Sequence, residues 1–181
     1  MSYKVPRRGA DGVPPPAAAP PPEAGSPAAV APPEEYVGDF YGLSVALTGF
    51  DDVELAGTGV GNLYLNWLVG AFPDVMPELL TAWRDIERDV PPAERPAALR
   101  ETILGDAVLG PFARSLIVLW YTATWRPPAW TPPRADNPEN VDRSFGVAYP
   151  EGLMWRAAIG AHPGGAKPTG FGTWAFPPRE A

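Results

Sequence analysis

Apolar residues recur at helical spacing through most of the chain, and they are densest in residues 109–125 (LGPFARSLIVLWYTATW). One face of this stretch carries Leu109, Phe112, Leu116, Leu119 and Trp120. Val118, Tyr121 and Trp125 widen that face, which indicates a helix that is buried on most sides. Asp106 is suited to cap its beginning, and Pro127-Pro128 prevent it from continuing. The pattern therefore predicts a central core helix.

Five further stretches show helical periodicity: residues 34–48, 58–71, 74–89, 92–104 and 149–159. The residues expected to face inward are Tyr36, Phe40, Leu43 and Leu47 in the first stretch, Leu63, Trp67 and Leu68 in the second, Val75, Leu79, Trp83 and Ile86 in the third, and Leu99 and Ile103 in the fourth. Gly49 supplies a stop after the first helix. No segment shows the alternation of a strand. The sequence thus predicts an all-α single domain of five to six helices over residues 34–159.

The two ends of the chain have a different composition from this helical region. Residues 1–33 are rich in proline and alanine and are predicted to form a disordered or polyproline-like tail. Residues 160–181 combine glycine and proline with large aromatic side chains, which predicts an extended, irregular C-terminal arm that packs on something. Residues 126–148 are predicted to form a long loop, and loops of this length are often functional.

Composition excludes several classes of function. The formal net charge of −7 gives no nucleic-acid footprint. The chain has no cysteine and one histidine, which excludes disulfides, iron–sulfur clusters and multi-histidine metal sites built from this chain alone. Arg114 interrupts the most apolar stretch, so we expect no membrane insertion.

The residues that could perform catalysis do not form a recognisable active site. The adjacent pairs Glu34-Glu35 and Asp51-Asp52 are typical of helix caps and solvated faces. His162 could serve as a base, but its glycine-rich surroundings favour a structural hydrogen-bonding role. No glycine pattern completes a dinucleotide or phosphate loop. We therefore predict no catalytic, cofactor-binding or metal-binding residue in this chain.

Aromatic residues cluster in the last third of the chain, and rigid rings of this kind are enriched at protein interfaces. The candidate partner-contacting residues are Trp120, Tyr121, Trp125, Trp130, Trp155, Phe171 and Trp174, with His162 and Lys167 as polar anchors. An equally good interpretation is that these rings fix the irregular segments to the chain's own helices. Both roles can hold together.

Three segments resemble a known family. Residues 43–52 (LSVALTGFDD), 119–125 (LWYTATW) and 149–175 (YPEGLMWRAAIGAHPGGAKPTGFGTWA) are similar to the small, or gamma, subunit of bacterial FAD-dependent sugar and polyol dehydrogenases. This family includes the small subunits of membrane-bound sorbitol and fructose dehydrogenases and of FAD glucose dehydrogenase. The resemblance covers roughly residues 36–176, and its last segment is the most specific.

The resemblance implies a non-catalytic subunit that binds, stabilises and helps to mature a large FAD-containing subunit of the glucose–methanol–choline oxidoreductase type. That large subunit holds the flavin and, in several family members, an iron–sulfur cluster. A cytochrome c subunit completes some of these complexes. Family members commonly begin with a twin-arginine export signal, whereas here Arg7-Arg8 precede proline rather than an apolar segment. We therefore expect a cytoplasmic location, with periplasmic export alongside the partner as the alternative.

Two other functions stay open at the level of sequence. The chain could be a free-standing carbohydrate-binding module that uses Trp125, Trp130 or Trp174 as stacking platforms. It could also be an enzyme in its own right, such as a hydrolase with paired carboxylates. Sugar binding by the isolated chain would favour the first of these, and turnover by the isolated chain would favour the second.

Overall fold

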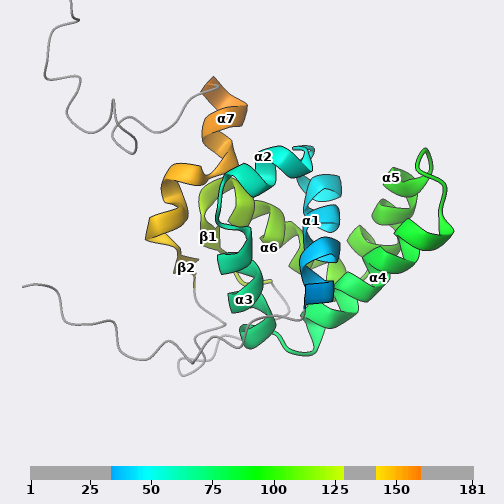
Figure 1. The fold of residues 1–181 in the computed structure, drawn as a ribbon. Helices are drawn as coiled ribbons and strands as arrows, with labels where there is room; N and C mark the ends of the chain where they lie inside the picture. Colours follow the sequence, from blue (N-terminus) through cyan, green and yellow to red (C-terminus); the bar gives the residue numbers. More distant parts are fainter. Residues whose placement is uncertain (1–33, 129–141, 160–181) are drawn as a thin grey trace, which may run out of the picture.

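The computed structural model describes residues 34–128 and 142–159, and this part of the chain is mostly helical (Figure 1). Its elements are α1 (Glu34–Thr48), α2 (Asp52–Gly57), α3 (Gly61–Ala71), α4 (Val75–Asp89), α5 (Arg95–Ala98) with the π-helical turn η1 (Leu99–Leu104), α6 (Leu109–Thr122), β1 (Thr124–Trp125), β2 (Arg143–Ser144), the 3-10 helix η3 (Gly146–Glu151) and α7 (Leu153–Ile159). The predicted all-α class is confirmed. The predicted N-terminal tail and C-terminal arm lie outside the described residues.

Helix α6 lies at the centre and packs against α1, α4, α7, β1 and η1 (Figure 1). All five residues predicted for its inward face are buried, as the sequence pattern indicated. The Trp120 ring lies against the rings of Phe40 and Tyr64, with centroids 5.9 and 5.3 Å away. Its indole Nε1 donates a hydrogen bond to Ser44 Oγ at 2.9 Å, so the polar atom of this buried ring is satisfied.

Short polar side chains and glycine set several helix ends. Asp51 caps α2 with a capping box, in which its carboxylate accepts the Glu54 N–H and the Glu54 carboxylate accepts the Asp51 N–H. Gly49 follows α1 with a φ of +79°, the left-handed conformation that glycine adopts without strain. Asp106 accepts the backbone N–H groups of Val108 and Leu109, both at 2.7 Å. The predicted cap at the beginning of α6 is therefore confirmed, because Asp106 accepts from backbone N–H groups that have no partner within the helix.

Two predicted boundaries are wrong. The helix predicted over residues 58–71 begins only at Gly61, and a short helix, α2, that was not predicted ends at Gly57 just before it. In α3 it is Tyr64 and Leu65 that are fully buried, whereas Leu63 is 38% exposed, so the predicted inward face is rotated. Two glycines, one of them Gly59 with a φ of +70°, break the helix between these elements.

The chain also leaves α6 earlier than predicted. Ala123 adopts a left-handed conformation with φ 54° and ψ 26°, which ends the helix at Thr122. Thr124 and Trp125 then pair antiparallel with Ser144 and Arg143. This two-residue ladder brings the far end of the predicted loop 126–148 back beside the end of α6.

No single helix in residues 34–128 and 142–159 is long and apolar enough to cross a membrane. The pair Arg95–Leu104 and Leu109–Thr122 passes this test only together, and it is bent by 112° at its break.

Candidate partner-binding site

An open apolar hollow of about 390 Å³ lies where the end of α6 meets the β1–β2 ladder, η3 and α7. Its lining residues are Thr122, Ala123, Thr124, Ser144, Phe145, Gly146, Tyr149 and Met154. The left-handed turn at Ala123 and the ladder that follows it create this hollow, because they place residues 122–124 beside residues 144–146. The backbone N–H of Phe145 donates to the carbonyl oxygen of Ala123 at 2.8 Å and fixes the two walls together.

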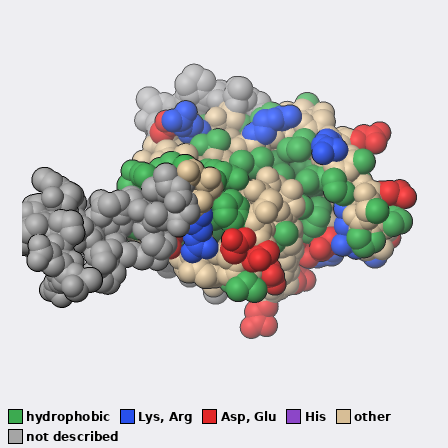
Figure 2. Space-filling view, turned by 90° about the horizontal axis from the view of Figure 1, so that it is seen from above, with side chains coloured by type: hydrophobic (Ala, Val, Ile, Leu, Met, Phe, Trp, Pro, Cys, Tyr) green, Lys and Arg blue, Asp and Glu red, His purple; other side chains and the backbone are tan. Residues whose placement is uncertain are grey.

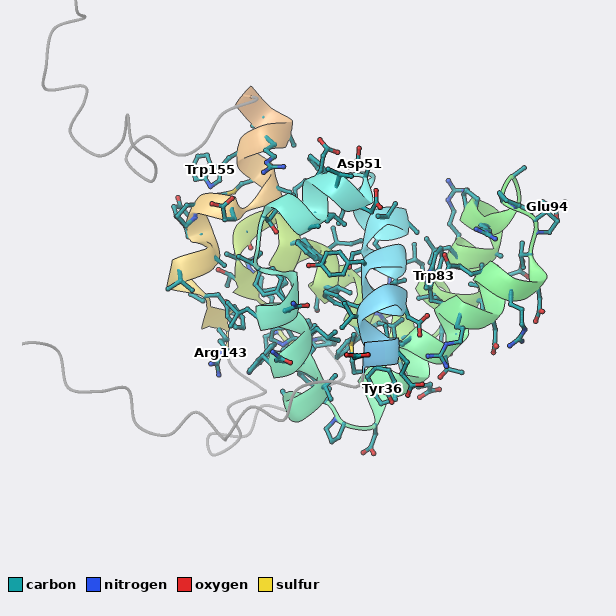
Figure 3. The ribbon with its side chains drawn as sticks, in the orientation of Figure 1. Tyr36, Asp51, Trp83, Glu94, Arg143 and Trp155 are labelled. Atoms are coloured by element: carbon teal, nitrogen blue, oxygen red, sulfur yellow. The ribbon has the colours of Figure 1, made fainter. Side chains whose placement is uncertain are left out.

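Large apolar side chains are exposed among the residues that line this hollow and their neighbours in sequence. Val147 is 82% exposed and Tyr149 is 46% exposed. The partly buried Trp155 packs edge-on against Tyr149, with ring centroids 5.4 Å apart, and its Nε1 donates to the Tyr149 carbonyl oxygen at 3.1 Å (Figure 3). Exposed apolar groups gathered in one place are typical of a protein-binding surface. We call Val147, Tyr149, Met154 and Trp155 the rim cluster.

The positive charge of Arg143 lies next to the hollow. The guanidinium of Arg143 lies over the rings of Trp67 and Phe145, 5.3 and 5.2 Å from their centroids (Figure 3). Phe145 lines the hollow on its other side. The stacking on two rings holds the exposed Arg143 in place, and no ion pair to it is found among residues 34–128 and 142–159, so its charge is available to a binding partner.

The structure corrects two of the predicted partner-contacting residues. Trp120 is 1% exposed and Trp125 is fully buried, so neither ring can reach a partner at the surface. Trp125 packs against Trp67, Phe72 and Phe112, with ring centroids 5.0–5.5 Å away. These two tryptophans hold the chain's own elements together, because rings of this size gain most by leaving water.

The remaining predicted residues divide into two groups. Tyr121 is partly buried and packs on Phe50. Its hydroxyl donates to the Thr48 carbonyl oxygen at 3.1 Å, so this donor is already engaged within the chain. Trp155 lies in the rim cluster. The predicted contacts Trp130, His162, Lys167, Phe171 and Trp174 lie outside the described residues.

Polar groups with catalytic potential serve structural roles in the described residues. Asp39 forms an ion pair with Arg84, and Asp51 caps α2. Ser44 accepts the hydrogen bond from Trp120. Burial, and secondarily the negative charge of Glu151, raise the pKa of the Tyr64 hydroxyl well above its usual value, which keeps this group neutral. Across residues 34–128 and 142–159, no group of three or more His, Cys, Asp or Glu side chains is placed to hold a metal ion.

Sequence reasoning missed Arg143, Phe145, Val147 and Met154 as site residues. The first three fall in the stretch predicted to be a loop, where short apolar runs such as SFGVA carry no helical or strand period. Their importance comes from the ladder with β1, which is a long-range pairing that local patterns do not report. Comparisons of the chain with protein-family models, with curated proteins and with solved structures gave no match.

Proposed function

We propose that this chain is a non-catalytic small subunit that binds and stabilises the FAD-containing catalytic subunit of a sugar or alcohol dehydrogenase. The observation that carries the proposal is the rim cluster beside an apolar hollow, with Val147 82% exposed. A surface of this kind lowers its free energy by docking on another protein. The resemblance of residues 43–52, 119–125 and 149–175 to dehydrogenase small subunits names the class of partner.

Three carboxylate and hydroxyl groups that have structural roles support the same proposal. Asp51, Asp106 and Ser44 each accept hydrogen bonds that organise a helix end or a buried ring. A subunit that only assembles with a partner needs these residues for its own structure. A hydrolase needs at least one carboxylate that is free to exchange protons with a substrate. The carbohydrate-binding alternative loses Trp125 as a stacking platform, because that ring is fully buried.

The test co-expresses the full chain with the large flavoprotein subunit encoded beside its own gene and measures copurified flavin absorbance and sugar-dependent dye reduction. Val147→Asp should weaken assembly by about 2 kcal/mol or more, roughly 30-fold in Kd, because it places an unpaired charge in the buried centre of the contact. The enzyme that still assembles should keep its KM for sugar. Val53→Asp on α2 is the matched control, because Val53 is 74% exposed and the charge change is identical.

Three outcomes would contradict the proposal. A neighbouring gene that encodes no flavoprotein would remove the partner. Equal assembly of both valine variants would move the contact away from the rim cluster. Sugar binding by the isolated chain, measured by calorimetry, would favour the carbohydrate-binding alternative.

A further inference from the structure

A second groove, of about 310 Å³, runs between α1 and the arm formed by α4, α5 and η1, far from the residues that line the hollow. Its lining residues are Gly42, Val45, Ala46, Trp83, Glu87, Pro92, Arg95, Pro96 and Leu99. Figure 1 shows α4 and α5 standing beside α1 at one end of the molecule, and Figure 2 shows hydrophobic side chains spread across the upper face toward that end. Small side chains on α1 and prolines on the opposite wall leave the groove open and apolar.

In the part of the chain that the structure describes, Trp83 places a buried donor without an acceptor in the wall of this groove. Its ring is 4% exposed, and its buried Nε1 has no hydrogen-bond acceptor among residues 34–128 and 142–159. Figure 3 shows Trp83 between α1 and the α4–α5 arm. At Gly42 an added Cβ would lie 2.9 Å from Nε1 and 3.3 Å from Glu87 Oε1, so the lack of a side chain at Gly42 leaves space next to this donor. Buried indole N–H groups usually have an acceptor, so the groove fits an occupant that supplies a carbonyl oxygen.

The polar groups on the other wall restrict the chemistry of that occupant. Arg95 donates from Nε to the Val90 carbonyl oxygen at 3.1 Å and from Nη2 to the Glu87 carbonyl oxygen at 2.7 Å, which fixes its guanidinium in the wall. The Glu87 carboxylate lines the groove near Gly42, where it can accept N–H groups but repels acidic ones. The groove therefore fits an uncharged, apolar segment that is rich in free carbonyl groups.

The chain carries such a segment directly before α1. Residues 13–22 (VPPPAAAPPP) are uncharged, and six of these ten residues are proline. A polyproline II segment makes no internal hydrogen bonds, so its carbonyl groups are free to accept, and it docks in grooves lined by aromatic side chains and proline. Ala17, Ala18 and Ala19 add three N–H groups that match the Glu87 carboxylate.

The length of the connecting segment also fits. Residues 23–33 link residues 13–22 to Glu34, and a flexible-chain linker of eleven residues has a root-mean-square length of about 17–20 Å. Ala46 lies twelve residues along α1 from Glu34, which is about 18 Å at 1.5 Å per residue. The effective concentration of a tethered ligand is highest when these two lengths agree. We propose that residues 13–22 dock in the Trp83 groove of the same chain as a polyproline II segment, with a carbonyl group accepting from Trp83 Nε1.

The absence of native cysteine makes a direct test possible in the full-length chain. One double variant carries Ala18→Cys with Ala46→Cys at the groove wall. The control carries Ala18→Cys with Ala56→Cys, an exposed alanine on α2 outside the groove. Disulfide formation within one chain should be at least about tenfold faster for the groove pair, because docking raises the local concentration of the two thiols. Replacing Pro20, Pro21 and Pro22 with glycine should abolish this difference, whereas replacing Pro32 and Pro33 with glycine should retain it.

The indole N–H resonance of Trp83, assigned by its loss in Trp83→Phe, provides a second measurement. It should be protected from hydrogen exchange in the native full-length chain, and the glycine replacements at Pro20, Pro21 and Pro22 should reduce that protection about tenfold or more. Equal disulfide rates in the two cysteine pairs would overturn the proposal. So would a preference that survives loss of the three prolines, or disulfides that form only between chains, which would assign the groove to the tail of a second copy.

Discussion

Two tryptophans of this chain differ in what surrounds them, although both were predicted to meet a partner. Trp120 is 1% exposed, contacts three aromatic rings and bonds Ser44, whereas Trp155 is partly exposed and contacts the ring of Tyr149. The helical pattern predicted Trp120 on the inward face of a buried helix, whereas the clustering of aromatic residues also included it among the partner contacts. Burial distinguishes them, and it assigns Trp120 to stability and Trp155 to the surface.

This difference predicts opposite results for one substitution at two positions. Trp120→Ala should lower the free energy of unfolding by about 3–5 kcal/mol, because it opens a cavity in the core and leaves Ser44 without its donor. Trp155→Ala is the control and should cost less than about 1 kcal/mol. Urea unfolding of the full-length variants, followed by circular dichroism, measures both values. Similar costs at the two positions would contradict the central position of α6.

The helices themselves differ in how well the sequence predicts them. Helices α1 and α4 follow the predicted ranges closely, because each carries a long apolar stripe, whereas α6 begins where predicted but ends at Thr122. Helix α2 has six residues, which is too short to show an apolar stripe. The pair Asp51-Asp52 by itself indicates only a helix cap or a solvated face. The hollow could not be predicted, because it depends on the left-handed turn at Ala123 and on a ladder closed across residues 126–142.

Helix α6 begins at a cap that should make stability depend on pH. Hydrogen bonds from the backbone N–H groups of Leu109 and Val108 lower the pKa of Asp106. The folded state therefore favours the carboxylate, and this contribution is present above the ordinary Asp pKa of about 3.9 and is lost as pH falls through the lower folded value. Asp106→Asn should flatten the acid limb of the stability curve measured by urea unfolding between pH 2 and pH 6, a range chosen around these pKa values.

The matched control for this cap is Asp74→Asn. Asp74 occupies the residue before α4, but its side chain makes no capping hydrogen bond. The acid dependence of this variant should therefore match that of the unmodified chain. An equal change in both variants would show that general charge, rather than the α6 cap, sets the acid dependence.

The contact between η1 and α6 predicts the effect of a glycine substitution. At Gly110 an added Cβ would lie 2.6 Å from the carbonyl oxygen of Leu104, a backbone atom that cannot move aside. Gly110→Ala should therefore destabilise the chain by about 1–3 kcal/mol. Gly70→Ala in α3 meets nothing within 4 Å and should instead stabilise it by about 0.5–1 kcal/mol, because alanine favours helix. Thermal unfolding distinguishes the two signs, and stabilisation at Gly110 would contradict the close packing of η1 on α6.

At the scale of the whole molecule, the described residues form one core around α6 with an apolar surface at the α7 end and a groove at the α4–α5 end. The net charge of −7 opposes association between copies, whereas the rim cluster favours it. In the part of the chain that the structure describes, Val147 and Tyr149 are exposed to water. The balance between charge repulsion and apolar attraction determines whether isolated copies of the chain associate.

This balance gives a prediction for the isolated chain. Val147→Asp should raise the concentration at which the protein stays monomeric in sedimentation velocity, because it removes apolar area from the rim cluster and adds a charge. Val53→Asp changes the net charge by the same amount and replaces a similarly exposed valine. A smaller rise in the monomeric concentration for this variant would assign the effect to the rim cluster rather than to charge. Added salt screens repulsion and should increase association of the unmodified chain more than that of Val147→Asp. Equal gains from both variants would mean that net charge alone controls association and that the α7 end is not the adhesive surface.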